Sequence, residues 1–420
     1  MTVRITTLQN GLRVVSDTMK QVETVSLGVW VDVGARYEPL QLHGISHLLE
    51  HMIFKGTKTR SAAQIAEEIE AVGGYLNAYT SREHTSYYSR VLKEDIALAI
   101  EILGDILLNS VFDEEELKRE QEVILQEIGQ VQDTPDDLVF DNLQATAFPD
   151  QSLGRPILGT EESVSSFDRA SLQTYMKPNY SAENMVVVAA GNLDHEALVA
   201  LVEKLFAKTG PNGKQSFEGG VYKGGESRLE RDLEQLHLTL GFENCSYHDD
   251  NYYAGQVYTT ILGGGMSSRL FQEVREKRGF AYSVYAFNAA HADTGLLSIY
   301  AGTGPEYVQD LIPIIAGEMK NLSEKTRADE LARAKAQLKT GLLTSLESTT
   351  QRIEQMGRQM MIFGRIKPVD ELVQKVEAVD MNAIQNVALK ILESLPTVAT
   401  IGYMETIPNY EDIQKAFSKS

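Results

Sequence analysis

Two histidines and a glutamate lie close together in the segment His47-Leu48-Leu49-Glu50-His51. An α-helix advances about 100° per residue, so on a helix the three polar side chains fall at about 0°, 300° and 40° and share one face. Two histidines spaced i and i+4 can bind one Zn²⁺ through their imidazole nitrogens. A carboxylate between them is then placed to take a proton from a water molecule at the metal. The spacing predicts a metal site that activates water.

The same pattern also fits a helix with two ordinary histidines and a surface glutamate. The remaining positions of this segment are apolar, namely Leu48, Leu49, Met52 and Ile53. Burying two imidazoles and a carboxylate without partners is costly, and a metal ion removes that cost. The apolar context therefore favours the metal site.

A catalytic zinc site needs a third protein ligand, because three ligands and one open position are typical. The segment that starts at Asp113 is expected to be helical, with an apolar stripe formed by Leu117, Ile124, Ile128 and Val131. Glu120 and Glu127 lie about two turns apart at the edge of this stripe. We expect one to be the third ligand and the other to orient a ligand, and the spacing does not say which. Two glutamates that extend to solvent at the helix flank explain the same spacing.

The two halves of the chain show the same order of expected elements. In the first half, strands at residues 12–15 and 25–31 precede a helix that begins near Gly44. In the second half, a strand at residues 236–242 precedes a helical stretch that leads to Gly263-Gly264-Gly265. The glycine-rich stretch lacks the following lysine and hydroxyl residue of a phosphate-binding loop. The repeated order indicates two related α+β domains, and a chance likeness is the alternative.

The expected domains are residues 1–210 and 227–420, joined by a glycine-rich linker at 211–226 that contains Pro211. Other helices are marked by their first residues. Ser61 and Gln64 fit a capping box, and Thr134-Pro135 fits a helix start with proline in the first position. A long helical stretch at residues 328–361 is expected to break near Gly341 or Gly357.

Composition and charge exclude several classes of protein. The chain has 420 residues, 43% hydrophobic, with 39 Lys and Arg against 59 Asp and Glu, a formal net charge of −20. This excess of acid argues against a nucleic-acid-binding surface and favours cationic partners if it is concentrated in a cleft. No apolar stretch fits a secretory signal or a membrane span. The single cysteine, Cys245, excludes an intrachain disulfide and a cysteine-based zinc site. We expect a cytoplasmic protein without nucleic-acid or membrane partners.

The chain resembles the pitrilysin/insulysin/mitochondrial processing peptidase family, whose reversed H-x-x-E-H order is the inverzincin signature. The first half carries HGISHLLEHMIFKGT, GGYLNAYTSREHTSYY, EEELKREQEVILQEI and NYSAENMVVVAAGNLD. The second half carries GGGMSSRLFQEVREKRGFAYSV and SLESTTQRIEQMGRQ. The likeness covers nearly the whole chain and is strongest to the short bacterial processing-peptidase-like members. It implies a processing-peptidase-like α+β fold, in which each domain is a mainly antiparallel sheet packed against helices.

The resemblance also implies roles for the residues of the predicted metal site. His47, His51 and Glu127 would hold one Zn²⁺ per chain, Glu50 would be the general base, and Glu120 would be an accessory acid near the metal. The second half has no H-x-x-E-H pattern, which implies that the second domain is catalytically degenerate.

Substrate-binding residues are implied in the first half of the chain. Leu76-Asn77-Ala78-Tyr79 resembles the edge strand to which a peptide substrate adds as a further β-strand. Asn77 also fits a turn residue at the end of a strand. Phe54 faces the metal side of its helix, where it could line the pocket after the scissile bond or belong to the core.

Two further pairs match positions that contact substrate in this family. Arg275 could hold a substrate carbonyl and Tyr282 could donate to the oxyanion, or the two could be a structural ion-pair residue and a core tyrosine. Asp137 and Asp141 match positions that bind a basic substrate residue in processing peptidases. Asp137 also fits a helix cap that starts at Thr134.

The resemblance leads to the hypothesis of a zinc endopeptidase that cleaves peptides or unfolded presequence-like segments, with Glu50 activating the attacking water. Family members enclose substrate between two two-domain halves, and this chain supplies one. We therefore expect a homodimer in which Arg275 and Tyr282 serve the zinc site of the partner. The alternatives are a non-catalytic subunit or peptide-binding protein on the same fold, or the catalytic subunit of a heterodimer. The complete set of His47, Glu50, His51 and Glu127 argues against the non-catalytic alternative.

Overall fold

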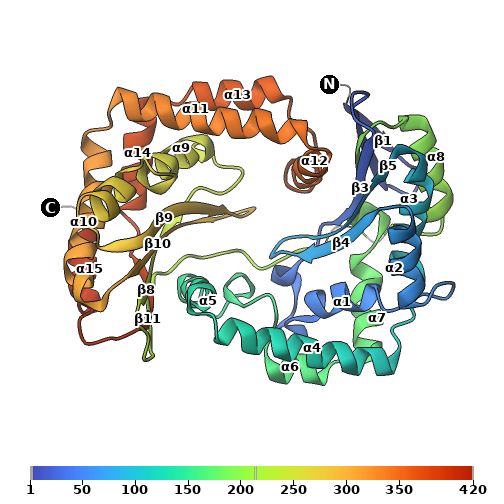
Figure 1. The fold of residues 1–420 in the computed structure, drawn as a ribbon, viewed down its shortest axis with the longest axis horizontal. Coiled ribbons are helices and arrows are strands. Elements are labelled where there is room, and N and C mark those ends of the chain that lie inside the picture. Colours follow the sequence, from blue (N-terminus) through green and yellow to red (C-terminus); the bar gives the residue numbers. More distant parts are fainter. Residues whose placement is uncertain (1–2, 212, 214, 419–420) are drawn as a thin grey trace. The chain divides into compact units, whose positions relative to one another are not determined.

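The computed structural model describes residues 3–211, 213 and 215–418. Positions 212 and 214 of the expected linker lie outside the described residues. The chain forms two compact units, each with a β-sheet and helices (Figure 1). Unit 1 consists of Met1–Gly129, Arg155–Glu218 and Thr344–Lys367, and unit 2 consists of Gln130–Gly154, Gly219–Leu343 and Pro368–Ser420. The expected α+β fold is confirmed, whereas the boundaries of the two sequence domains stay a prediction.

Unit 1 contains a six-stranded sheet in the order β1-β2-β6-β3-β5-β4. Its strands are β1 (Val3–Thr7), β2 (Arg13–Thr18), β3 (Thr24–Val31), β4 (Tyr75–Thr80), β5 (Thr85–Leu92) and β6 (Met185–Gly191). All neighbours pair antiparallel except β2 and β6, which are parallel. Strand β4 lies at the edge of the sheet, as predicted for the segment Leu76–Tyr79.

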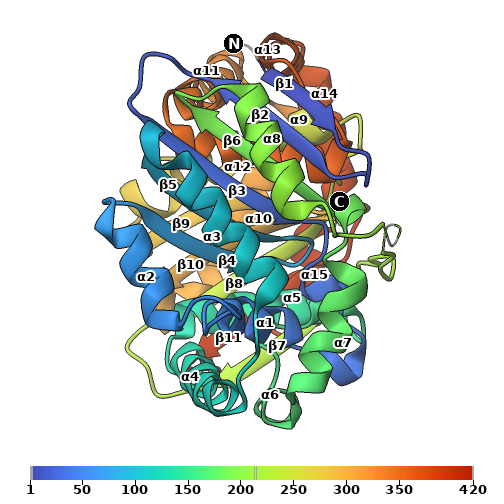
Figure 2. The ribbon, with the colours of Figure 1, turned by 90° about the vertical axis from the view of Figure 1, so that its right-hand side faces the viewer.

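The helices of unit 1 are α1 (Ile45–Ile53), α2 (Ala62–Ala71), α3 (Ile96–Asn109), α4 (Glu114–Gln132), α6 (Glu161–Ser166), α7 (Arg169–Asn179), α8 (His195–Phe206) and α12 (Thr349–Phe363). Helix α4 ends in the first residues of unit 2. Helices α3 and α8 lie across one face of the sheet (Figure 2). In β3, Leu27 and Val29 point into this core, while Trp30 points to the opposite face, as the two-residue period of a strand requires.

The opposite face of the same sheet is covered by α12, which comes from the second half of the sequence. Ile353, Met356 and Met360 of this helix pack against Trp30. A Cβ atom added to Gly357 would lie 2.4 Å from the Trp30 ring, so the close approach of α12 requires glycine there. The expected helix break therefore does not occur at Gly357.

Unit 2 contains a five-stranded sheet in the order β7-β11-β8-β10-β9. Its strands are β7 (Gly225–Glu230), β8 (Leu236–Asn244), β9 (Ala281–Ala290), β10 (Gly295–Thr303) and β11 (Thr397–Gly402). The α-helices are α5 (Pro135–Ala147), α9 (Tyr252–Gly263), α10 (Val308–Glu324), α11 (Ala328–Thr344), α13 (Val369–Glu377), α14 (Met381–Ile391) and α15 (Tyr410–Phe417). Helix α11 ends at Thr344, shortly after Gly341, so the break in the long helical stretch lies there.

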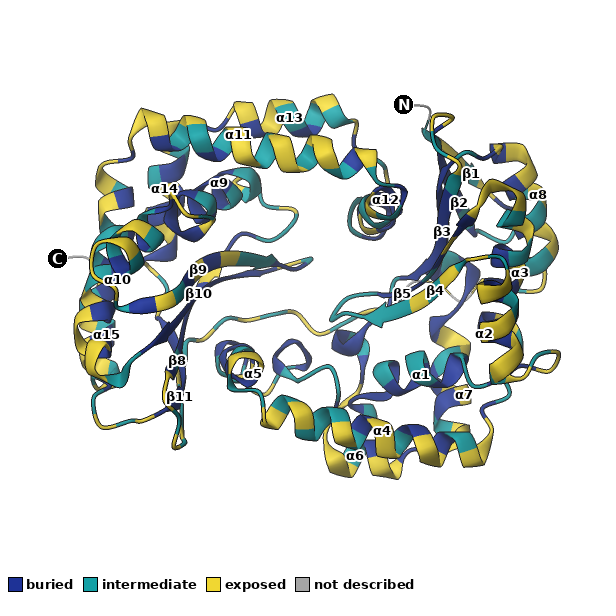
Figure 3. Cartoon of the chain, in the orientation of Figure 1, coloured by how far each residue is buried: buried dark blue, intermediate teal, exposed yellow. Residues whose placement is uncertain are grey.

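The sheet of unit 2 repeats the order β2-β6-β3-β5-β4 of unit 1, again with one parallel pair, β7 and β11. Helices α9, α10 and α14 share one core with this sheet, and α5, from the first half of the sequence, packs on the other side. Both sheets carry buried strands between partly exposed helices (Figure 3). The described part of the chain has no helix with the length and apolar character needed to cross a membrane.

Candidate metal centre

Helix α1 is held at its first turn by a buried carboxylate. Glu38 accepts hydrogen bonds from the backbone N–H of Gly44 at 2.7 Å and of Ser46 at 2.8 Å. An anionic group is favourable at a helix N-terminus, where backbone N–H groups lack partners. Burial nevertheless raises the pKa of Glu38 to about 7, against the lowering effect of these hydrogen bonds. Gly44 has a φ of +92°, and an added Cβ atom would lie 2.7 Å from Gly159, so both its conformation and its surroundings require glycine.

The apolar face of α1 fixes the direction of its polar face. The helix buries its apolar side chains completely: Ile45, Leu48, Leu49, Met52 and Ile53. Ser46 adds a hydroxyl contact of 2.8 Å with Tyr175 of α7. Rotation of α1 is therefore restricted, and His47, Glu50 and His51 share the remaining face. The predicted helix is confirmed.

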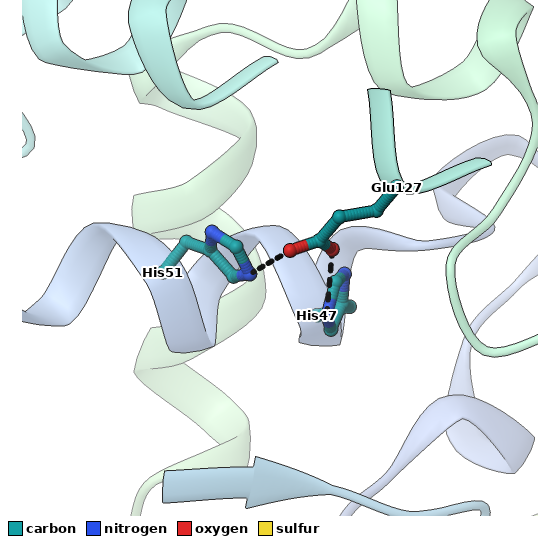
Figure 4. Close-up of side chains that lie close together, drawn as sticks. All are labelled: His47, His51 and Glu127. Carbon is teal, nitrogen blue, oxygen red and sulfur yellow. Dashed lines mark ion pairs between the residues drawn. The ribbon is translucent and has the colours of Figure 1, made fainter. Parts of the chain in front are cut away.

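Glu127 of α4 reaches both histidines of α1 (Figure 4). Its Oε2 lies 3.7 Å from His47 Nε2, and its Oε1 lies 3.8 Å from His51 Nε2. One ligand atom from each residue lies within 4.8 Å of the others, and no second group of this kind is found among the described residues. Ligands at about 2.0–2.1 Å from a tetrahedral zinc are about 3.3 Å apart, only slightly closer than these atoms. The three side chains form a candidate metal site.

Glu120 contacts His51 on the side away from Glu127. Its Oε2 lies 2.9 Å from His51 Nδ1, and its Oε1 lies 2.6 Å from Lys55 Nζ. A carboxylate accepts at this contact, so Nδ1 donates and Nε2 is the ring nitrogen that faces Glu127. This is the arrangement by which a carboxylate orients a metal-binding histidine. Of the two glutamates left open by the helical spacing, Glu127 approaches both Nε2 atoms and Glu120 orients one ring.

His47 carries a buried nitrogen without a hydrogen-bond partner, Nδ1. Burial, together with the charge of His51, lowers the pKa of His47 to about 4. The ring is therefore neutral at physiological pH, and its Nε2 lone pair is available beside Glu127. Two histidine imidazoles and one carboxylate are a donor set of catalytic zinc sites, so the residues present fit this metal.

Glu50 lies on the same face of α1 but is not part of the three-residue group. Its Oε2 accepts a hydrogen bond of 2.6 Å from the hydroxyl of Thr80, the last residue of β4. Burial raises the pKa of Glu50, while the donors of Thr80 and the charge of His51 lower it. The carboxylate is thus held next to the candidate ligands by the end of the edge strand.

The residues expected to bind substrate along β4 lie in its interior. Asn77 Oδ1 accepts a hydrogen bond of 2.8 Å from the backbone N–H of Ala78, so Asn77 is not a turn residue. The Tyr79 hydroxyl donates to Glu354 of α12 at 2.8 Å and lies 3.0 Å from His84 Nε2. Phe54 is half-buried, with its ring centroid 6.4 Å from that of Tyr87.

Comparison with known proteins agrees with this arrangement. Residues 13–161 match the family model described as Insulinase (Peptidase family M16), and residues 166–338 match the one described as Peptidase M16 inactive domain. The chain belongs to peptidase family M16. An uncharacterized zinc protease of Rickettsia felis is 42% identical and covers 95% of this M16 chain and 97% of its own length. An uncharacterized zinc protease of Bacillus subtilis is 38% identical and covers 96% of this chain and 99% of its own length.

Another M16 relative is a probable mitochondrial-processing peptidase subunit beta of Arabidopsis thaliana, which is 39% identical and covers 98% of this chain and 80% of its own length. Two solved structures share the fold. A protease from Helicobacter pylori superimposes with a TM-score of 0.88 at 20% identity, covering 95% of this chain and 99% of that one. A chain of complex III2 from Candida albicans superimposes with a TM-score of 0.88 at 23% identity, and both chains are fully covered.

Four of the predicted site residues of this M16 chain belong to unit 2. The Arg275 guanidinium lies 4.8 Å from the ring centroid of Tyr282, which is 74% exposed and so is not a core residue. Asp137 is exposed on the first turn of α5, and Asp141 lies one turn further along. Thr134 makes no side-chain cap, because its hydroxyl donates to the carbonyl of Gln130, whereas Asp137 lies in the first turn of α5, where an acidic residue is favourable.

Three residues around the candidate metal site were not predicted from the sequence. Glu38 and Thr80 act through contacts between separate elements, which helical spacing does not reveal. Lys55 follows His51 by one helical turn, and this spacing beside Glu120 could have indicated it.

Proposed function

We propose that this M16 chain is a zinc metalloendopeptidase that hydrolyses peptides or unfolded presequence-like segments. The observation that carries the proposal is the convergence of His47 Nε2, His51 Nε2 and the Glu127 carboxylate beside Glu50. Relatives named zinc proteases, which match nearly the whole chain, support it.

The chain's own residues suit the proton transfers of peptide hydrolysis. Zinc bound by His47, His51 and Glu127 supplies Lewis acidity, which acidifies water and polarises a peptide carbonyl. Glu50 takes the proton from the attacking water and passes it to the leaving amine. Its half-buried position favours this role, because a raised pKa makes the carboxyl able both to accept and to release a proton.

Substrate is proposed to pair with the edge strand β4. Among the described residues, no strand lies next to the side of β4 that faces away from β5. A peptide that adds alongside Asn77, Ala78 and Tyr79 binds through main-chain hydrogen bonds, which tolerate many sequences. Phe54, at the end of α1, is proposed to contact the residue after the scissile bond.

Residues of unit 2 are proposed to complete substrate binding. Arg275 and Tyr282 are held together by the cation–π contact and offer donors for a carbonyl and for the developing oxyanion. Asp137 and Asp141 are proposed to bind a basic side chain, in keeping with the net charge of −20.

A homodimer is proposed, in which Arg275 and Tyr282 of one protomer serve the metal site of its partner. The relative from Arabidopsis thaliana is named as a subunit, which supports an assembly of this kind. A chain that sediments as a monomer at micromolar concentration while cleaving peptide would contradict the homodimer. Two alternatives to the homodimer are considered. In one, this chain is the catalytic subunit of a heterodimer; in the other, it is a non-catalytic subunit.

The test of the proposed function is cleavage of a basic model peptide by the purified chain alone, together with metal analysis. We expect one zinc per chain, loss of cleavage after chelation and recovery on adding Zn²⁺. A zinc-loaded chain that leaves the peptide intact would overturn the proposal and favour the non-catalytic or heterodimeric assembly.

A further inference from the structure

The last residue of the edge strand contacts the proposed general base. Thr80 Oγ1 lies 2.6 Å from Glu50 Oε2 and 3.5 Å from the carbonyl oxygen of Ser46 on the same helix. The Ser46 carbonyl belongs to the first turn of α1, so the Thr80 hydroxyl lies against both Glu50 and the helix that carries it. A short hydrogen bond to a carboxylate restricts the position of the oxygen that accepts it.

The turn that follows β4 shows which of its backbone amides face the open edge. In an antiparallel strand, successive N–H groups point alternately toward the neighbouring strand and away from it. The Ser81 N–H donates to the carbonyl of His84 across the hairpin, so by this alternation the N–H groups of Leu76, Ala78 and Thr80 point away from β5. The Ala78 N–H agrees, since it donates to Asn77 Oδ1 at 2.8 Å. Glu50 therefore stands at the end of the row of amides that an added peptide would meet.

We propose that Thr80 is a positioning residue that fixes the Glu50 carboxylate at the end of the open edge of β4 and thereby sets which peptide bond of a paired substrate reaches the base. This inference rests on the proposed function. A peptide can pair with Leu76 and Ala78, but its pairing stops at Thr80, whose edge position Glu50 occupies. The bond that follows the paired segment is then the one presented to Glu50.

The surroundings of Thr80 keep this end of β4 rigid. Thr80 pairs with Thr85 across a tight turn, in which the Ser81 N–H donates to the carbonyl of His84 at 2.8 Å. The preceding residue, Tyr79, is held by Glu354 of α12. A β-branched side chain has few χ1 choices, so the Thr80 hydroxyl keeps one direction. The position of the Glu50 carboxylate is thus fixed by the strand that is proposed to bind the substrate.

The test compares Thr80→Val, which has the same shape without the hydroxyl, with Thr80→Ser, which keeps the hydroxyl. Thr85→Val is the matched control, because its hydroxyl in the same hairpin donates to the carbonyl of Val33 instead. For Thr80→Val we expect kcat to fall about 10- to 100-fold, with KM and zinc content unchanged and with additional cleavage at neighbouring bonds. Thr80→Ser should stay within about threefold of the parent chain, and Thr85→Val should keep its kcat.

Crystal structures of the metal-free variants provide a readout that does not depend on activity. The Glu50 carboxylate should keep its place in Thr80→Ser and leave it in Thr80→Val. The inference is overturned if Glu50 stays in place in Thr80→Val, if kcat of Thr80→Val stays within about twofold of the parent, or if Thr80→Ser or Thr85→Val loses as much kcat as Thr80→Val. Absence of cleavage by the parent chain would instead overturn the proposed function and leave the structural test of Thr80 standing.

Discussion

The Nδ1 atom of His51 lies 2.9 Å from Oε2 of Glu120, whose other oxygen contacts Lys55. The contacts from Lys55 through Glu120 to His51 hold the imidazole ring with its Nε2 facing Glu127. Carboxylates in this position contribute to metal binding without touching the metal.

Replacing Glu120 with Gln should therefore weaken zinc binding by about 10- to 100-fold without removing the site. Competition with a coloured chelator measures the affinity. Glu122→Gln, an exposed position on the same helix, is the control and should bind zinc like the parent chain. Equal affinities for Glu120→Gln and the parent would show that Glu120 does not orient His51.

Replacing Glu127 with Gln should have a larger effect, because it removes the charged oxygen atoms next to both histidines. We expect the purified variant to hold well under one zinc per chain by elemental analysis, while its far-ultraviolet circular dichroism stays unchanged. Full zinc occupancy in this variant would mean that another residue completes the site.

The buried carboxyl of Glu38 should make stability depend on pH. Its pKa is about 7 in the folded chain against 4.5 without burial, so the folded state binds more protons between these values. The free energy of unfolding should therefore fall as pH rises through this window, by up to about 3 kcal/mol. Denaturant unfolding of the metal-free parent and of Glu38→Gln, at pH 5 and pH 8, isolates the effect. Between pH 5 and pH 8, we expect the parent to lose more unfolding free energy than Glu38→Gln. If the parent instead gained unfolding free energy relative to the variant, the hydrogen bonds from the helix N-terminus would outweigh burial.

Two helical glycines should respond oppositely to alanine. At Gly357 in α12, the added Cβ atom would lie 2.4 Å from Trp30, so Gly357→Ala should destabilise the chain by about 1–3 kcal/mol. At Gly341 in α11, an added Cβ atom would have no atom of another described element within 4 Å, so Gly341→Ala should be neutral or stabilise by up to about 1 kcal/mol. Thermal or denaturant unfolding measures both. Similar effects at the two positions would contradict the close packing of α12 on Trp30.

Local patterns were sufficient for the elements whose partners lie nearby in the sequence. The capping box of Ser61 and Gln64, the polar face of α1 and the strand that contains Trp30 were all predicted, because each depends on one periodic segment. The exchange by which α5 packs in unit 2 and α12 packs in unit 1 was not predicted. Both helices are amphipathic, and the apolar face of a helix does not indicate which of two sheets it packs against.

In the candidate site too, the residues that depend on one helix could be predicted, and those that depend on packing between elements could not. His47, Glu50 and His51 follow from the turn length of one helix, whereas the choice between Glu120 and Glu127 depends on how α4 lies against α1. Thr80 was not predicted because its role depends on the hydrogen-bonding direction of a strand end beside a helix from another part of the chain.

The most direct test of the central claim is Glu50→Gln, measured for zinc content and peptide hydrolysis on the same sample. Gln keeps the shape of the side chain but cannot take the proton of the attacking water. If Glu50 is the general base of a zinc peptidase, the variant holds one zinc per chain and its kcat falls by at least about 100-fold. Hydrolysis at the rate of the parent chain by the zinc-loaded variant would contradict the account.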